Sequence, residues 1–122
     1  MKTLLQRIWV IPFITALSAC NGGSSSSASA PENRHPIADA GIDITTLEEK
    51  LVTLDGRNSS DPDQDQIIYK WVQISGPLTN LSSDSDDSPS FIAPSGDATL
   101  RYQLYISDGI DSSIPDTVTI QV

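Results

Sequence analysis

The chain has 122 residues, with 16 Asp and Glu against seven Lys and Arg, and its formal net charge at pH 7 is −9. A chain of this length forms one small domain, and its negative charge repels phosphate groups, which excludes nucleic acids as partners. The single histidine, His35, falls in a linker-like segment, so no Ser-His-Asp set is available and we expect no enzymatic activity. The single cysteine, Cys20, cannot form a disulfide within the chain.

The first 19 residues have the three-part layout of a secretory signal peptide. Lys2 and Arg7 are basic, residues 8–17 are mostly apolar, and small residues precede Cys20. A membrane-spanning helix needs about 20 apolar residues. Only 12 residues lie between Arg7 and Cys20, and one of them is proline. We therefore predict a signal peptide over residues 1–19; the alternatives are ordinary secretion with a free cysteine and a short membrane anchor.

The run Leu17-Ser18-Ala19-Cys20 resembles the lipobox of bacterial lipoproteins. The resemblance implies cleavage before Cys20, followed by acylation of its thiol and of the new amino terminus. Two or more acyl chains anchor a protein stably, whereas one chain binds a membrane only marginally. Asn21 stands where lipoproteins of Gram-negative bacteria carry aspartate when they stay in the inner membrane. The resemblance therefore implies the outer membrane, on either its periplasmic or its surface side.

Residues 20–36 have the composition of a flexible linker that begins with the acylated cysteine. They contain Gly22-Gly23, four consecutive serines, Pro31 and Pro36, and no large apolar side chain. Such a segment cannot bury enough apolar surface to offset the entropy of ordering the chain. We therefore predict a linker that lifts the domain off the lipid surface, with His35 as a solvated linker residue.

From residue 37 to Val122 the apolar residues alternate with polar ones at the period of a β-strand. We predict an all-β fold, a seven-stranded antiparallel immunoglobulin-like sandwich. The predicted strands are residues 42–45, 51–54, 67–74, 78–81, 90–93, 100–107 and 117–122. The predicted core consists of Val52, Leu54, Tyr69, Trp71, Phe91, Leu100, Tyr102, Leu104, Ile106, Val118 and Ile120.

Short motifs within residues 37–122 occur in a fixed order. They are Ala38-Asp39-Ala40-Gly41, Val52-Thr53-Leu54-Asp55-Gly56, Ser59-Ser60-Asp61-Pro62-Asp63-Gln64-Asp65, Tyr69-Lys70-Trp71, Ser75-Gly76-Pro77, Phe91-Ile92-Ala93-Pro94 and Asp108-Gly109. Together they resemble the PKD-like modules of the K319 and REJ type found in bacterial surface proteins. The resemblance implies an immunoglobulin-like sandwich that is usually non-catalytic and is attached to adhesins, surface proteins or polymer-degrading enzymes. Gln64 stands where the family usually has glycine.

The aspartates are concentrated in three of the predicted loops. In a seven-stranded sandwich, the loops after the second, fourth and sixth strands lie at the end where the linker enters. These loops hold nine of the 13 aspartates, namely Asp55, Asp61, Asp63, Asp65, Asp84, Asp86, Asp87, Asp108 and Asp111. We therefore predict an acidic pole at the entry end, with the C-terminus at the far end.

Asp61, Asp63 and Asp65 alternate in the manner of many calcium-binding loops. Ca²⁺ takes six to eight oxygen ligands, which clustered aspartates and loop carbonyls supply. The resemblance points the same way, because some PKD modules bind calcium near their N-terminal junction. The alternative is turn chemistry, since aspartate accepts hydrogen bonds from nearby backbone amides in turns. An EF-hand is excluded, because Gln66 stands where its loop requires glycine.

The sequence thus predicts a non-enzymatic, lipid-anchored protein of the cell envelope that displays one PKD-like domain for binding a protein or a glycan. Four residues face away from the predicted core, and they either supply a binding surface or have a role at a sheet edge or in sheet packing: Tyr105, Lys70, Val72 and Ile74. One alternative is a structural spacer, with or without calcium, that recognises no soluble ligand. Another is the N-terminal part of a longer surface protein.

Overall fold

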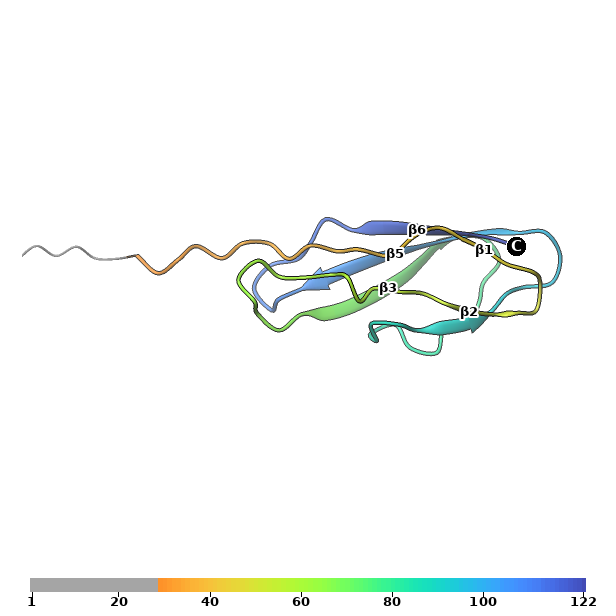
Figure 1. Ribbon diagram of the computed structural model, residues 1–122, viewed down its shortest axis with the longest axis horizontal. Helices are drawn as coiled ribbons and strands as arrows, with labels where there is room; N and C mark the ends of the chain where they lie inside the picture. The colour runs from red at the N-terminus through yellow and green to blue at the C-terminus, as the bar shows by residue number, and fades with distance from the viewer. Residues whose placement is uncertain (1–28) are drawn as a thin grey trace, which may run out of the picture. The chain divides into compact units, whose positions relative to one another are not determined.

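A computed structural model describes residues 29–122, so the predicted signal peptide and Cys20 lie outside the described residues. Asn33–Val122 fold together as one unit, called the domain below. Its regular elements are all β-strands, as the ribbon in Figure 1 shows. Within residues 29–122, no helix is long and apolar enough to cross a membrane.

The domain contains six strands arranged in two sheets. They are β1 (Ile44–Thr45), β2 (Leu51–Thr53), β3 (Ile68–Ser75), β4 (Ser90–Ile92), β5 (Thr99–Ser107) and β6 (Asp116–Gln121). A four-stranded sheet has the order β1-β6-β5-β3, and β2 pairs with β4 in a second sheet. The predicted all-β sandwich is confirmed, with six strands in place of seven.

One strand pair departs from the predicted antiparallel arrangement. β1 pairs with β6 in parallel, whereas the other neighbouring strands are antiparallel. Both β1 and β6 run from the end where the chain enters the domain toward the end that holds the C-terminus (Figure 1). Two strands that run in the same direction along one edge of a sheet can pair only in parallel.

The strand predicted at residues 78–81 does not form, and that prediction was wrong. Gly76 has a φ of +94° and Pro77 has no amide hydrogen to donate, so the chain turns there. The Leu78 side chain is 90% exposed. The amide of Thr79 donates to Oε1 of Gln73 at 3.1 Å. It therefore bonds to a side chain and not to the backbone of a neighbouring strand. Leu78 and Leu81, at the two ends of this segment, suggested a strand. The turn at Gly76 and Pro77 keeps the segment from pairing as one.

The two sheets enclose an apolar core. In β5, every second side chain points inward and is buried. Ten of the 11 predicted core residues are buried, and the exception, Tyr69, is half-buried at the rim, where burial raises the pKa of its phenol. Ala40 and Ala93 were not predicted, because a small side chain gives little hydrophobic contrast. The buried apolar residues are Ala40, Val52, Leu54, Trp71, Phe91, Ala93, Leu100, Tyr102, Leu104, Ile106, Val118 and Ile120.

Trp71 connects the core with the loop that follows the failed strand. Its amide donates to the carbonyl of Asp84 at 2.8 Å, and its indole Nε1 donates to the carbonyl of Asp86 at 3.0 Å. These bonds hold the loop along the free edge of β3. They also protect that edge, because part of the backbone available for pairing with another strand is already occupied.

Candidate functional site at the entry end

The chain enters the domain through residues 33–41, called the strap below. From Ile37 onward the strap is part of the fold, because Ile37 and Ser60 exchange two backbone hydrogen bonds of 2.7 and 3.0 Å. Ala40 is buried, and its amide donates to Oδ2 of Asp116 at 2.7 Å. Pro36 favours an extended conformation for the residue before it, which keeps the chain straight as it arrives. The strap therefore crosses the entry end in a defined position.

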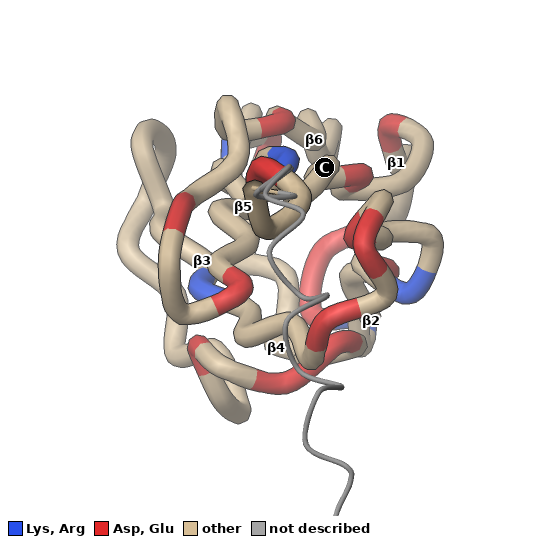
Figure 2. The backbone as a smooth tube through the Cα atoms, turned by 90° about the vertical axis from the view of Figure 1, so that its left-hand side faces the viewer, with Lys and Arg blue, Asp and Glu red and all other residues tan. Residues whose placement is uncertain are grey.

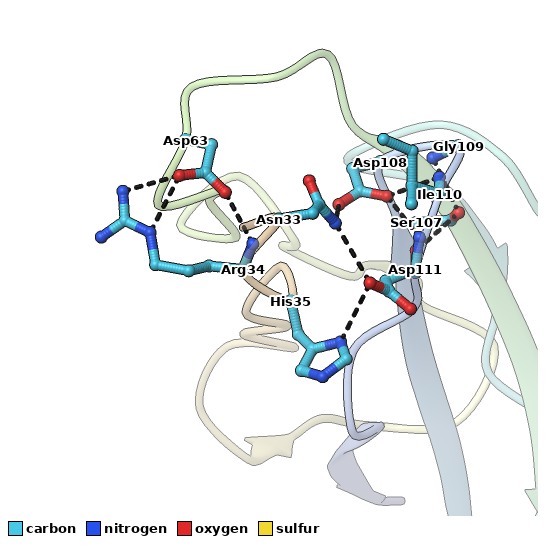
Figure 3. Close-up of polar contacts among 9 residues, drawn as sticks. All are labelled: Asn33, Arg34, His35, Asp63, Ser107, Asp108, Gly109, Ile110 and Asp111. Atoms are coloured by element: carbon cyan, nitrogen blue, oxygen red, sulfur yellow. Dashed lines mark hydrogen bonds and ion pairs between the residues drawn. The ribbon is translucent and has the colours of Figure 1, made fainter. Parts of the chain in front are cut away.

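The contacts of the strap begin at Asn33, within the last four residues of the predicted linker. Arg34 binds Asp63 twice, through its amide to Oδ2 at 2.7 Å and through Nε to Oδ1 at 2.8 Å. Nδ2 of Asn33 donates to one carboxylate oxygen each of Asp108 and Asp111, at 2.9 and 3.1 Å. Figure 3 shows these side chains converging on the strap from two loops. The three aspartates Asp63, Asp108 and Asp111 are called the clasp below.

His35 also lies beside the clasp. Its Nδ1 is 3.7 Å from Oδ2 of Asp111, although 72% of the side chain is exposed. The sequence predicted His35 to be a solvated linker residue, and its high exposure agrees with that prediction. Its position beside Asp111 was not predicted. A protonated imidazole at this distance attracts a carboxylate only weakly, because water screens an exposed pair.

Two of the clasp carboxylates, Asp63 and Asp108, are stabilised in their ionised form. The amide of Arg34, and then its guanidinium, lower the pKa of Asp63. The amide of Asp111, the side chain of Asn33 and the amide of Ile110 lower the pKa of Asp108. Asp108 in turn counteracts part of the lowering at Asp63, which places the two loops within electrostatic range of each other. Asp63 and Asp108 therefore stay negatively charged in neutral solution.

The structure brings the three predicted metal ligands together. Asp61, Asp63 and Asp65 each offer an oxygen atom, and these oxygens all lie within 4.8 Å of one another. Oδ1 of Asp61 accepts the amides of Asp63 and Asp65 at 2.7 and 3.2 Å, which is turn chemistry. Oδ2 of Asp61 is buried and has no hydrogen-bond partner. That oxygen fits a cation ligand, whereas both oxygens of Asp63 are already engaged by Arg34.

The turn that positions these carboxylates contains a residue in an unusual conformation. Gln64 has a φ of +68°, and its amide donates to the carbonyl of Asp61 at 3.1 Å. Glycine adopts this left-handed region at no steric cost, which explains the glycine that related modules carry there. Having Gln64 in place of glycine therefore costs this loop conformational free energy.

The predicted acidic pole is smaller than expected. Asp84 and Asp86 do not join it, because the chain never forms the fourth predicted strand that would return them to the entry end. They lie along β3, where Asp84 pairs with Lys70 and both carbonyls accept hydrogen bonds from Trp71. Asp87 belongs to the same loop, and its carbonyl accepts the amide of Gly56. Figure 2 looks onto the entry end and shows acidic positions in several of the loops around it.

A second candidate surface is the outer face of the four-stranded sheet. In β3, the side chains of Ile68, Lys70, Val72 and Ile74 point outward, and Val72 and Ile74 are 39% and 46% exposed. Tyr105 lies opposite Lys70 in register and is half-buried, with its hydroxyl donating to Gln103 at 2.9 Å. In β3, β5 and β6, none of the outward positions is acidic. The outer face, as we name it, consists of Ile68, Lys70, Val72, Ile74, Arg101, Gln103, Tyr105, Ser107, Thr117, Thr119 and Gln121.

Two facing sheets around the buried Trp71 define an immunoglobulin-like sandwich. The family model described as "K319L-like, PKD domain" matches residues 40–122. Because this match covers more than half of the chain, the chain belongs to the K319L-like PKD domain family. Its PKD resemblance is therefore confirmed. No curated protein was found to match the chain.

Solved structures agree on the fold. A nucleoside hydrolase-related hypothetical protein from Saccharophagus degradans, associated with carbohydrate metabolism, is 24% identical with a TM-score of 0.63; the match covers 72% of this chain and 25% of that one. The PKD domain of human KIAA0319 is 19% identical over 82% and 91% of the two chains, with a TM-score of 0.57. The PKD domain of the KIAA 1837 protein is 22% identical over 76% and 91%, with a TM-score of 0.52. This chain thus spans a quarter of the length of the first protein.

Proposed function

We propose that this chain is a non-enzymatic, lipid-anchored protein of the outer membrane that displays its PKD domain to bind a protein or glycan partner. The observation that carries the binding role is the outer face of the four-stranded sheet. It combines exposed aliphatic side chains with Tyr105 and two cations, and none of its own side chains is acidic, although Asp84 from the adjacent loop pairs with Lys70. A contiguous apolar patch on a soluble domain often marks an interaction site.

The outer face and the strap use different parts of the domain. The strap contacts the loops at the entry end, whereas the outer face is built from β3, β5 and β6. A partner on the outer face therefore does not compete with the chain that leads to Cys20. The association of the Saccharophagus degradans protein with carbohydrate metabolism supports glycans as the first partners to test.

The binding role is tested with a glycan array and with pull-down from envelope extracts. Val72→Asp places a charge in the middle of the outer face and should abolish any specific capture. Ile92→Asp is the matched control, because Ile92 is equally an exposed strand residue but lies on β4, in the other sheet. Capture that survives Val72→Asp, or that disappears equally in both variants, excludes the outer face as the binding surface.

The anchor is tested separately at Cys20. Wild-type protein should incorporate labelled palmitate and fractionate with the outer membrane, because its acylated cysteine holds it there. Cys20→Ser should lose the label and leave the membrane fraction. Membrane association that persists in Cys20→Ser without label would favour the short apolar anchor, and release of both proteins would favour ordinary secretion.

A second candidate function is a calcium-stabilised spacer, and the unpaired buried oxygen of Asp61 favours it. Asp61, Asp63 and Asp65 would hold the ion together with loop carbonyls. Millimolar calcium should then raise the melting temperature of the domain, and Asp63→Ala should remove the rise. Asp97→Asn, in an exposed loop outside this cluster, is the control that should keep it. If calcium does not change the melting temperature, the domain has no calcium site that stabilises it.

A further inference from the structure

We propose that residues 33–36 are a detachable end of the strap, docked on the clasp in the structure and released as a unit to lengthen the tether. The evidence is a change in the kind of contact at Ile37. Beyond this residue, backbone pairing with Ser60 and the buried Ala40 fix the chain in the fold. Before it, the clasp carboxylates and the Pro62 carbonyl accept the hydrogen bonds of Asn33 and Arg34, and residues 33–36 take part in no strand pairing.

The docked end is exposed to water. The side chains of Arg34 and His35 are 64% and 72% exposed. Pro36 has no amide hydrogen with which to continue the backbone pairing of Ile37. An exposed ion pair shifts an equilibrium by less than about tenfold, since water and salt screen it. The docked end is therefore held by a small number of individually weak contacts, and it can open without disturbing the sandwich.

The contacts are nevertheless specific. Arg34 engages the loop that carries Asp63, both by its charge and by a bond from Nη2 to the Pro62 carbonyl at 2.7 Å. Asn33 engages the other loop through Asp108 and Asp111. Two adjacent residues thus bind two separate loops, as Figure 3 shows, and so join the loops to each other. Opening frees both loops together.

Release has a mechanical consequence. Four residues span at most about 14 Å when extended, so opening adds no more than this to the reach of the domain and leaves Ile37 as the new pivot. If the chain is anchored at Cys20 as proposed above, tension along the tether acts first on the clasp, which lies outside the backbone-paired part. The docked state then fixes the orientation of the domain relative to the tether, and the released state lets the domain rotate about Ile37.

Trypsin cleavage after Arg34 measures the opening directly, because a guanidinium bound to Asp63 cannot enter the protease. The full chain is purified in detergent and cleavage at Arg34–His35 is followed by mass spectrometry. Cleavage at Lys50–Leu51 is the internal standard for global unfolding, since the Lys50 carbonyl accepts the amide of Ala93 at 2.8 Å. When opening is fast relative to cleavage, the rate reports the population of the open state.

Asp63→Asn should accelerate cleavage after Arg34 by about three- to tenfold, the range expected for losing one exposed ion pair with its hydrogen bonds. Asp65→Asn is the matched control in the same loop, and it should leave the rate unchanged because Arg34 binds Asp63 and the Pro62 carbonyl in this loop and not the Asp65 carboxylate. Raising the salt concentration should accelerate the wild-type protein but not Asp63→Asn. Cleavage at Lys50 should stay constant throughout.

Asn33→Ala provides a second variant should Asp63→Asn disturb its own loop. It removes the bonds to Asp108 and Asp111 without touching residues 61–65, and it should also accelerate cleavage after Arg34. The proposal is overturned if wild-type protein is cut at Arg34 as fast as a free peptide of residues 29–40. It is equally overturned if neither variant changes the rate.

Discussion

The sandwich core and the entry end of the same domain are held together by different forces. Leu100 and Leu104 are fully buried between two sheets, and their strand is paired on both sides. Asp63 and Asp108 instead hold the strap through charge-assisted hydrogen bonds near water. Burial of apolar surface is not screened by salt and does not depend on mild acid, whereas carboxylate contacts respond to both. The core therefore sets the stability of the fold, and the entry end can respond to conditions without unfolding it.

This difference is tested most strongly by truncating a residue at the centre of the core. Leu104→Ala removes a fully buried side chain opposite Trp71 in register, and a buried Leu→Ala change lowers the free energy of unfolding by about 2–5 kcal/mol. Urea denaturation followed by tryptophan fluorescence measures the loss. Ile74→Ala, at an exposed position, should change the free energy by less than about 0.5 kcal/mol. Equal effects of the two substitutions would contradict the core position of Leu104.

A smaller loss is expected from crowding the same region. A Cβ added to Gly56 would lie 2.9 Å from Cδ2 of Leu104 and 3.0 Å from Cζ2 of Trp71. Overpacking of this kind costs about 1–3 kcal/mol, so Gly56→Ala should destabilise the domain by that amount. Gly96→Ala is the comparison, because an added Cβ there meets nothing within 4 Å and only its φ of +81° opposes it.

The two glycine variants are distinguished by NMR. Gly56→Ala should shift the indole N–H signal of Trp71, since the new methyl group presses on its ring. Gly96→Ala should leave that signal in place even where it lowers the melting temperature. An unmoved Trp71 signal in Gly56→Ala would mean that the close approach does not exist in solution.

At the entry end the expected sign of a substitution reverses. Gln64 has a φ of +68°, a region that costs residues other than glycine about 1–2 kcal/mol. Glycine removes this strain but adds about 0.5–1 kcal/mol of unfolded-chain entropy, so Gln64→Gly should stabilise the domain by about 0.5–1 kcal/mol. Gln66→Gly, where φ is not positive, should destabilise it. Thermal melts of the two variants side by side decide the matter, and a lower melting temperature for Gln64→Gly would be the contrary result.

The sequence predicted the core better than the site for a physical reason. Alternation of apolar and polar side chains reflects burial directly, so β5 and β6 could be placed residue by residue. Residues 78–81 have the same apolar character, but the turn at Gly76 and Pro77 directs them away from any partner strand. The position of Asp84 and Asp86 was inferred by counting strands, and one missing strand was enough to misplace both.

The strap was the least predictable part. Asn33 and Arg34 follow a serine-rich stretch whose composition indicates a linker, and composition carries no information about where a segment docks. The only signal in the sequence was Arg34, the one cation of the linker, in a chain whose loop at residues 61–65 is rich in aspartate. The three predicted metal ligands were found together because they lie within one five-residue turn, whereas the clasp comes from two loops far apart in the sequence.

The smallest predicted effect concerns pH and the loop after β2. Arg57 donates from Nε and Nη2 to the two oxygens of Asp55, at 2.8 and 2.9 Å, and so lowers the pKa of Asp55 from 3.8 to about 2. The folded state therefore favours the ionised carboxylate. Its contribution to stability is complete above pH 3.8 and is lost as the pH falls from 3.8 toward 2. Because both side chains are exposed, the contribution is small.

Carbon-13 NMR titration of the Asp55 carboxyl measures this directly. Arg57→Gln removes the guanidinium that lowers the pKa, so the midpoint of Asp55 should return toward 3.8. The stability of Asp55→Asn should lie slightly below that of the wild-type protein at neutral pH and converge with it as the pH falls below about 2, where Asp55 loses its charge in the folded state as well. The core variant Leu104→Ala should show no such convergence, because its loss comes from a cavity that protons do not fill. A midpoint of Asp55 that Arg57→Gln leaves unchanged would mean that the backbone of this loop, and not the ion pair, holds the carboxylate.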